Sequence, residues 1–65
     1  MNIPRRTAAL KREIEYRRNE LDRIERLRAA GEPTVISFPE HLALYIDEIR
    51  KGIADREAEI RRLQG

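Results

Sequence analysis

Six residues with helical spacing place basic and hydrogen-bonding side chains on one face of a predicted N-terminal helix. We call them the outer face, and no acidic residue falls among them: Arg5, Arg12, Tyr16, Asn19, Arg23 and Arg26. Guanidinium groups bind phosphate, an exposed aromatic ring can stack on a base, and an amide can bond a base edge. The pattern therefore predicts a surface for an acidic partner, either a nucleic acid or an acidic protein. The alternative is a solvated helix surface without a ligand, in a purely structural coiled-coil module.

The distribution of charge favours the same face. Residues 1–32 carry 9 basic and 6 acidic side chains, whereas residues 33–65 carry 5 and 6. The net charge of +2 is small, and charges of both signs are interleaved along the chain. This pattern is typical of solvated helices rather than of a disordered polybasic tail. The positive excess therefore belongs to the first half of the chain.

Two further arginines stand at apolar positions of the helical pattern. Arg17 and Arg56 interrupt a row of aliphatic residues, and Glu13, Glu20 and Glu59 lie within one helical turn of one or the other. Paired with these glutamates, the arginines could fix the register of two packed helices. Unpaired, they could hold a small phosphorylated or nucleotide ligand between two protomers. The sequence leaves both interpretations open for Arg17, Arg56 and Glu13.

The residue types needed for catalysis or metal binding are scarce. The chain has one histidine, His41, one serine, Ser37, and no cysteine. A nucleophile with a base and an orienting group cannot be assembled from these residues. A metal site would need His41 from two protomers together with carboxylates. We expect no enzyme activity, no cofactor and no metal.

The elements that must position these residues are two long helices. Residues 3–30 hold no internal glycine, Pro4 suits a first helical turn, and Asn2 is a candidate N-cap. Gly31 and Pro33 form a helix stop, and a loop over residues 31–37 follows. The motif Ser37-Phe38-Pro39-Glu40 predicts a capping box at the start of a second helix over residues 38–64.

The apolar spacing is that of an antiparallel coiled coil. Inward positions step by three and four, and we call them the seam: Ile3, Thr7, Leu10, Ile14, Arg17, Leu21 and Ile24 in the first helix, and Leu42, Ile46, Ile49, Ile53, Arg56, Ile60 and Leu63 in the second. A short loop between such helices forces them to run antiparallel. The sequence predicts an all-α fold, a single helical-hairpin domain over residues 1–65.

A hairpin of this size buries little apolar surface by itself. Four residues beside the seam are candidates for contact with a second copy, which would give a homodimeric four-helix bundle: Leu27, Leu44, Tyr45 and Gly52. Gly52 lies in the middle of a helix, where a close approach by another helix would explain it. No apolar run is long enough to span a bilayer, and the first residues lack the apolar stretch of a signal peptide, so we expect a cytoplasmic protein.

In architecture the chain resembles the Rop family of plasmid RNA-binding dimers. The resemblance rests on the length, on the hairpin topology and on the basic and aromatic residues of the outer face, and not on a sequence motif. It implies a dimeric four-helix bundle whose paired first helices bind RNA. The longer loop and the two seam arginines depart from that family's pattern. A small chain of this kind is also typical of phage and plasmid accessory proteins.

Overall fold

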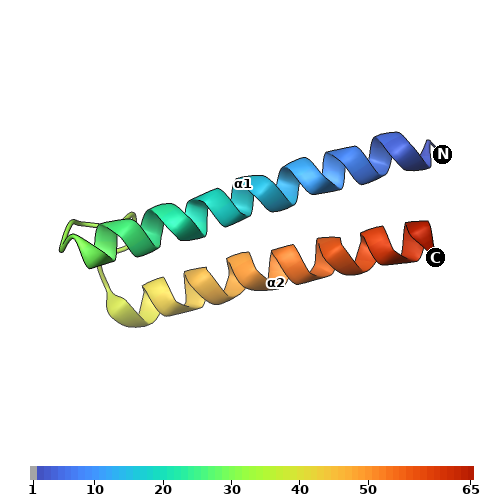
Figure 1. Cartoon of the computed structure of the whole chain (residues 1–65). Helices are drawn as coiled ribbons and strands as arrows, with labels where there is room; N and C mark the ends of the chain where they lie inside the picture. The colour runs from blue at the N-terminus through green and yellow to red at the C-terminus, as the bar shows by residue number, and fades with distance from the viewer. Residues whose placement is uncertain (1) are drawn as a thin grey trace.

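A computed structural model describes residues 2–65 and shows two antiparallel helices. Helix α1 spans Ile3–Ala29 and helix α2 spans Pro39–Gln64. Both chain ends lie at one end of the molecule and the connecting loop at the other (Figure 1). The molecule measures 44 × 18 × 14 Å along its principal axes. The predicted all-helical hairpin is therefore confirmed, with each helix boundary within one residue of its expected place.

The ends of α1 follow from local hydrogen bonding. The side chain of Asn2 accepts a hydrogen bond from the backbone N–H of Arg5 at 3.0 Å, so Asn2 is the N-cap. At the other end Gly31 adopts a positive φ of 71°. This left-handed turn lets the N–H of Glu32 donate to the Leu27 carbonyl at 2.8 Å and ends the helix.

The predicted capping box at the start of α2 is wrong. The N-cap is Phe38, with extended backbone angles, and no side chain caps the helix there. Pro39 has its φ angle fixed at a helical value, and it holds the residue before it in an extended conformation. The helix therefore begins one residue later than the box requires. Ser37 lies outside the helix, and Glu40 comes one position too early to reach back to the N-cap.

The seam positions form the core. Leu10 and Ile24 are 1% and 2% exposed, and Ile14, Leu42 and Ile49 are also buried. Thr7, placed in the seam by its spacing, is buried as well. The prediction is wrong for Ile3, which is 44% exposed in the first turn of α1, so the buried part of the seam does not reach that end of the helix.

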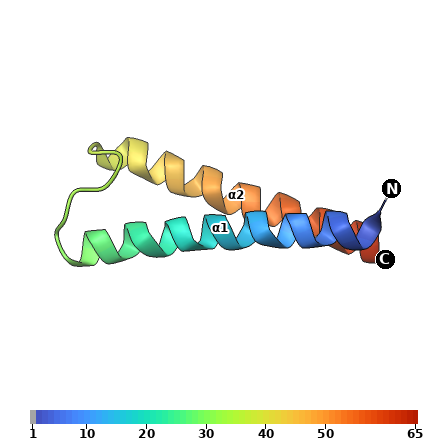
Figure 2. The ribbon, with the colours of Figure 1, turned by 90° about the horizontal axis from the view of Figure 1, so that it is seen from above.

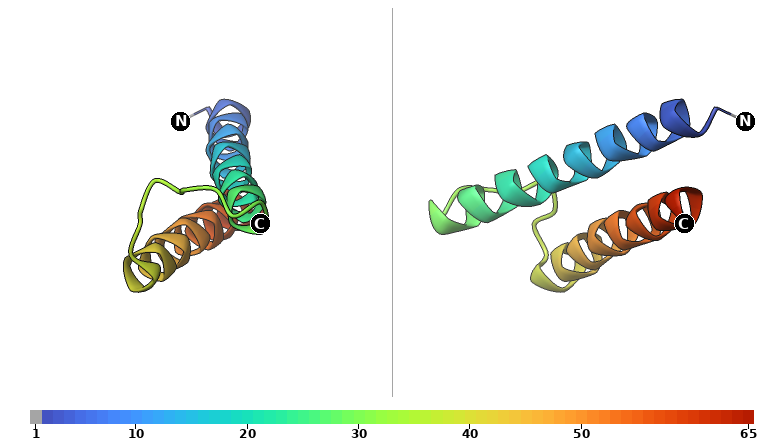
Figure 3. Two further views of the ribbon diagram at one scale, coloured as in Figure 1. Left: turned by 90° about the vertical axis from the view of Figure 1, so that its left-hand side faces the viewer. Right: turned by 45° about the vertical axis from the view of Figure 1, so that its right-hand side comes forward.

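The apolar cluster around Ile24, Leu42 and Ile49 lies in the loop-side half of the hairpin. Leu21, Tyr45, Ile46 and Ile53 pack against it, and so does Ile36 from the loop. Figures 2 and 3 show that the helix axes are inclined to each other and that their loop-side ends lie further apart. The loop residue Ile36 therefore adds apolar cover where the two helices diverge.

Neither described helix is long and apolar enough to cross a bilayer.

Candidate functional site

All six outer-face residues are exposed on α1. Tyr16 in their middle is 73% exposed, so most of its side chain is accessible to a partner. The prediction that these residues share an accessible surface agrees with this burial pattern. The structure adds which of their charges are already paired.

Acidic neighbours neutralise the C-terminal half of the outer face. Arg23 pairs with Glu20, whose carboxylate oxygen lies 3.0 Å from the guanidinium, and Arg26 lies 3.4 Å from Asp22. Arg5 and Arg12 form no ion pair within 4.0 Å among residues 2–65. The uncompensated positive charge of this face therefore lies in its N-terminal half.

An open depression adjoins the tyrosine. It has a volume of about 370 Å³ and is lined by Ala9, Arg12, Glu13, Tyr16 and Arg17. The lining combines an aromatic ring, two guanidinium groups and one carboxylate on a single helix. Such a surface can contact a flat ring and a phosphate at once.

The two seam arginines meet over Gly52 within one chain. A Cβ atom built on Gly52 would lie 3.2 Å from Arg17 Nε and 3.2 Å from Arg56 Nη1. Each guanidinium also donates to a backbone carbonyl four residues earlier in its own helix, Arg17 to Glu13 at 3.2 Å and Arg56 to Gly52 at 2.9 Å. Gly52 thus makes room for two arginine side chains of its own hairpin.

The charge balance of this cluster is incomplete. A carboxylate oxygen of Glu13 lies 3.4 Å from Arg56 Nε, but this buried nitrogen has no hydrogen-bond partner in the described chain. Arg17 has no carboxylate within 4.0 Å among residues 2–65. Of the other glutamates expected as partners, Glu20 binds Arg23, and Glu59 binds Arg6 at 2.9 Å.

Two ion pairs between the helices were not anticipated from the sequence. Arg6 pairs with Glu59, and Arg18 pairs with Glu57 at 2.8 Å. The hydrogen bond from Arg6 lowers the pKa of Glu59 below its usual value, and the same bond raises the pKa of Arg6. Both pairs follow from the seam register, because the residues beside opposed seam positions must face each other across the groove. Reading the positions beside the seam would have found them.

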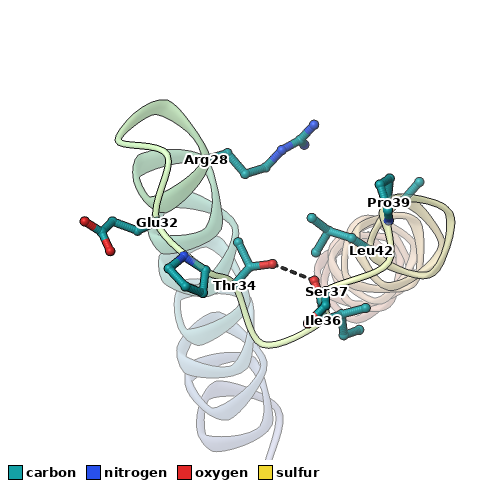
Figure 4. A pocket seen from close by; sticks show the side chains of 9 residues that line it. Arg28, Glu32, Thr34, Ile36, Ser37, Pro39 and Leu42 are labelled. Carbon is teal, nitrogen blue, oxygen red and sulfur yellow. Dashed lines mark hydrogen bonds between the residues drawn. The ribbon is translucent and has the colours of Figure 1, made fainter.

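A second depression lies at the loop end, with a volume of about 360 Å³ (Figure 4). The last turn of α1, the loop and the first turn of α2 contribute its lining residues, which include Arg28, Thr34, Ser37 and Leu42. The Thr34 hydroxyl donates to the Ile36 carbonyl at 2.7 Å and fixes the turn of the loop. No ion pair within 4.0 Å holds Arg28 in the described chain.

The residues predicted to contact a second copy differ in their surroundings. Leu44 is 64% exposed on α2, whereas Leu27 is partly buried. Tyr45 packs against the core cluster of its own chain. The arginine side chains described above occupy the space over Gly52. An intramolecular contact thus accounts for a glycine at this position.

The histidine has an aromatic neighbour. The ring of His41 meets the ring of Phe38 edge-on, with centroids 5.5 Å apart. No group of three or more histidine or acidic side chains in the described part of the chain could hold a metal ion.

Comparisons with protein-family models, with curated proteins and with solved structures gave no match.

Proposed function

We propose that this protein is a non-enzymatic binding module whose outer face binds the phosphate backbone of a nucleic acid. The observation that carries the proposal is the N-terminal half of that face. Among residues 2–65, Arg5 and Arg12 are exposed and have no carboxylate within 4.0 Å, and they lie on the same face as a tyrosine that is 73% exposed. Arginine side chains without a paired acid can bind phosphates and so release the counterions that are condensed on the nucleic acid.

Tyr16 and Asn19 favour a nucleic acid over an acidic protein. A flat aromatic ring beside a guanidinium can stack on an unpaired base, and an amide can bond a base edge. An acidic protein could use the charges and pack against the ring, but it has no base face on which the ring could stack and no base edge for the Asn19 amide. The resemblance to RNA-binding helical hairpins supports the same choice.

We also propose that two copies pair to form a four-helix bundle. The buried core of one hairpin is small, since five apolar side chains are less than about a tenth exposed. Leu44 and Phe38 remain 64% and 65% exposed, and Leu27 and Tyr45 lie partly buried near the same end of the hairpin. A second copy packed there would bury these side chains and add a hydrophobic contribution of about 25 cal/mol for each Å² of apolar surface.

Nucleic-acid binding is tested by fluorescence anisotropy with a labelled RNA stem-loop and a DNA duplex at several salt concentrations. The affinity should fall steeply as the salt concentration rises. The Arg12→Gln substitution should weaken binding and reduce the salt slope by about one, because one phosphate contact is lost. Lys51→Gln removes the same charge from α2 and is the matched control. If both variants bind equally, or if neither nucleic acid binds, the proposal is wrong.

Tyr16→Ala tests the role of the ring separately. If the tyrosine stacks on a base, this variant should bind the stem-loop more weakly by a factor of about five or more, and its salt slope should stay unchanged. The variant leaves the fold intact, because Tyr16 is 73% exposed. Capture of acidic proteins without any affinity for RNA or DNA would instead favour the acidic-protein partner.

Pairing of two copies is tested by native mass spectrometry and light scattering over a range of protein concentrations. Leu44→Lys should shift the equilibrium toward the monomer, because a charge would enter the proposed contact. Val35→Lys places the same charge at a loop position that is 59% exposed and serves as the control. A monomeric wild-type chain at every concentration would contradict the proposed bundle.

A further inference from the structure

We propose that Arg17 and Arg56 form a binding site for one phosphate-class oxyanion within a single hairpin. The site lies beside the seam, over Gly52, and its ligand is inorganic phosphate or the phosphate group of a small ester. Neither arginine is among the six outer-face residues, although Arg17 also lines the depression beside Tyr16. One chain supplies both guanidinium groups, so the site is complete without a second copy.

The geometry prepares the two guanidinium groups for a shared ligand. Both lie against the same glycine, with Arg17 Nε and Arg56 Nη1 each 3.2 Å from the position of a Cβ. A hydrogen bond to a backbone carbonyl anchors each group through its Nη1 atom. The Nη2 atom of each arginine makes no hydrogen bond to another described residue. Each anchored guanidinium group therefore has unused N–H donors, and these can donate hydrogen bonds to the several acceptor oxygens of a phosphate.

The charges around the pair favour an anion. Arginine stays protonated in proteins, so the cluster holds two positive charges. Glu13 supplies one carboxylate at 3.4 Å from Arg56, and the acids one turn away are bound to Arg23 and Arg6. Arg56 is 26% exposed, and its buried Nε lacks a hydrogen-bond acceptor. Asp55 and Glu59 line the hollow beside Arg56, but neither forms an ion pair within 4.0 Å with Arg17 or Arg56 among residues 2–65. A cationic pair that is partly removed from water binds an anion more strongly than an exposed pair does.

The glycine explains why the pair can form. Any side chain at residue 52 would begin with a Cβ atom in tight contact with both guanidinium groups. Gly52 costs the helix about 1 kcal/mol relative to alanine. In return it lets two like-charged groups approach the backbone, where the carbonyl of Gly52 itself accepts a hydrogen bond.

The test is a titration of the full chain with inorganic phosphate. The titration is monitored by NMR through the ¹H–¹⁵N signals of the arginine Nε–H groups. We expect saturable shifts at Arg17 and Arg56. Sodium chloride at matched ionic strength should not reproduce them. The outer-face variant Arg5→Gln, which lies outside the depression that Arg17 lines, should give the same titration curve, so failure of this site and failure of the outer-face function are distinguishable. Signals of Arg17 and Arg56 that stay in place, or that move equally with chloride, would overturn the proposal.

Substitution of Glu13 gives a second and opposite-signed test. Glu13→Gln removes the resident carboxylate without shortening the side chain, so phosphate should bind about fivefold tighter. Glu20→Gln removes an acid that is bound to Arg23, and it should leave the phosphate affinity unchanged. If Glu13→Gln abolishes phosphate binding in a chain that keeps its helical circular dichroism, the carboxylate is part of the site and the proposal is wrong.

Discussion

Substitution of Gly52 by alanine tests the arrangement of the arginine pair most directly. Alanine should gain about 1 kcal/mol over glycine from its helix propensity. Its Cβ atom would lie 3.2 Å from Arg17 Nε and Arg56 Nη1 and 3.5 Å from Arg17 Cδ. The first two contacts are closer than ordinary van der Waals distance, so both flexible side chains must move by a few tenths of an ångström. That movement strains the hydrogen bond from Arg56 to Gly52, and losing such a bond costs about 1 kcal/mol.

The two effects nearly cancel, so Gly52→Ala should change the free energy of unfolding by less than about 0.5 kcal/mol. In a background in which both Arg17 and Arg56 are replaced by alanine, the two 3.2 Å contacts are absent, and the same substitution should stabilise the hairpin by about 1 kcal/mol. Urea unfolding followed by circular dichroism measures all four corners of this double-mutant cycle.

Equal stabilisation of both backgrounds by about 1 kcal/mol would show that the two arginines do not pack over Gly52. A loss of more than about 2 kcal/mol, together with dissociation on dilution, would mean that a helix of a second copy contacts this glycine. Each outcome would refute the intramolecular packing described above.

Three further predictions follow from the burial and bonding of single side chains. Asn2→Ala removes the acceptor for the Arg5 N–H and should lower the stability by about 1 kcal/mol in thermal unfolding. Leu10→Ala should cost about 2–5 kcal/mol because Leu10 is 1% exposed, whereas Leu44→Ala should cost far less, and comparable losses in urea unfolding would contradict the observed core. The hydrogen bond from Arg6 lowers the pKa of Glu59, so the pair stabilises the fold at pH values above the usual glutamate pKa. This contribution disappears as the pH falls through the lowered pKa of Glu59. Glu59→Gln should therefore lower the melting temperature near about pH 7 and leave it unchanged near about pH 2, where equal effects would refute the pairing.

The spacing of apolar residues was sufficient to predict the hairpin, because only one register buries the aliphatic positions of both helices. Leu10, Ile14, Ile24, Leu42 and Ile49 were all expected in the seam and are the buried hydrophobic residues. The N-cap at Asn2 and the left-handed turn at Gly31 were predictable for the same kind of reason, since each depends on local backbone chemistry.

The candidate site was harder to predict, because arginine side chains are long and can choose among several partners. Glu20 lies one turn from Arg17 and also one turn from Arg23, and the sequence does not say which it binds. In the structure it binds Arg23, so Arg17 is left without a carboxylate among residues 2–65 and the charge of Arg23 on the outer face is paired. The start of α2 was missed for a local reason, because the fixed φ of Pro39 outweighed the serine and glutamate signal.

The position of the apolar cluster has a consequence for how the hairpin forms. Ile24, Leu42 and Ile49 lie on the loop side, where the chain between contacting residues is shortest and the entropy lost on closing the loop is smallest. The hairpin should therefore close from the loop toward the chain ends, and thermal fluctuations should open it in the reverse order. Arg5 and Arg12 lie toward the end that closes last. A partner bound to them would therefore bind the part of α1 that separates first from α2.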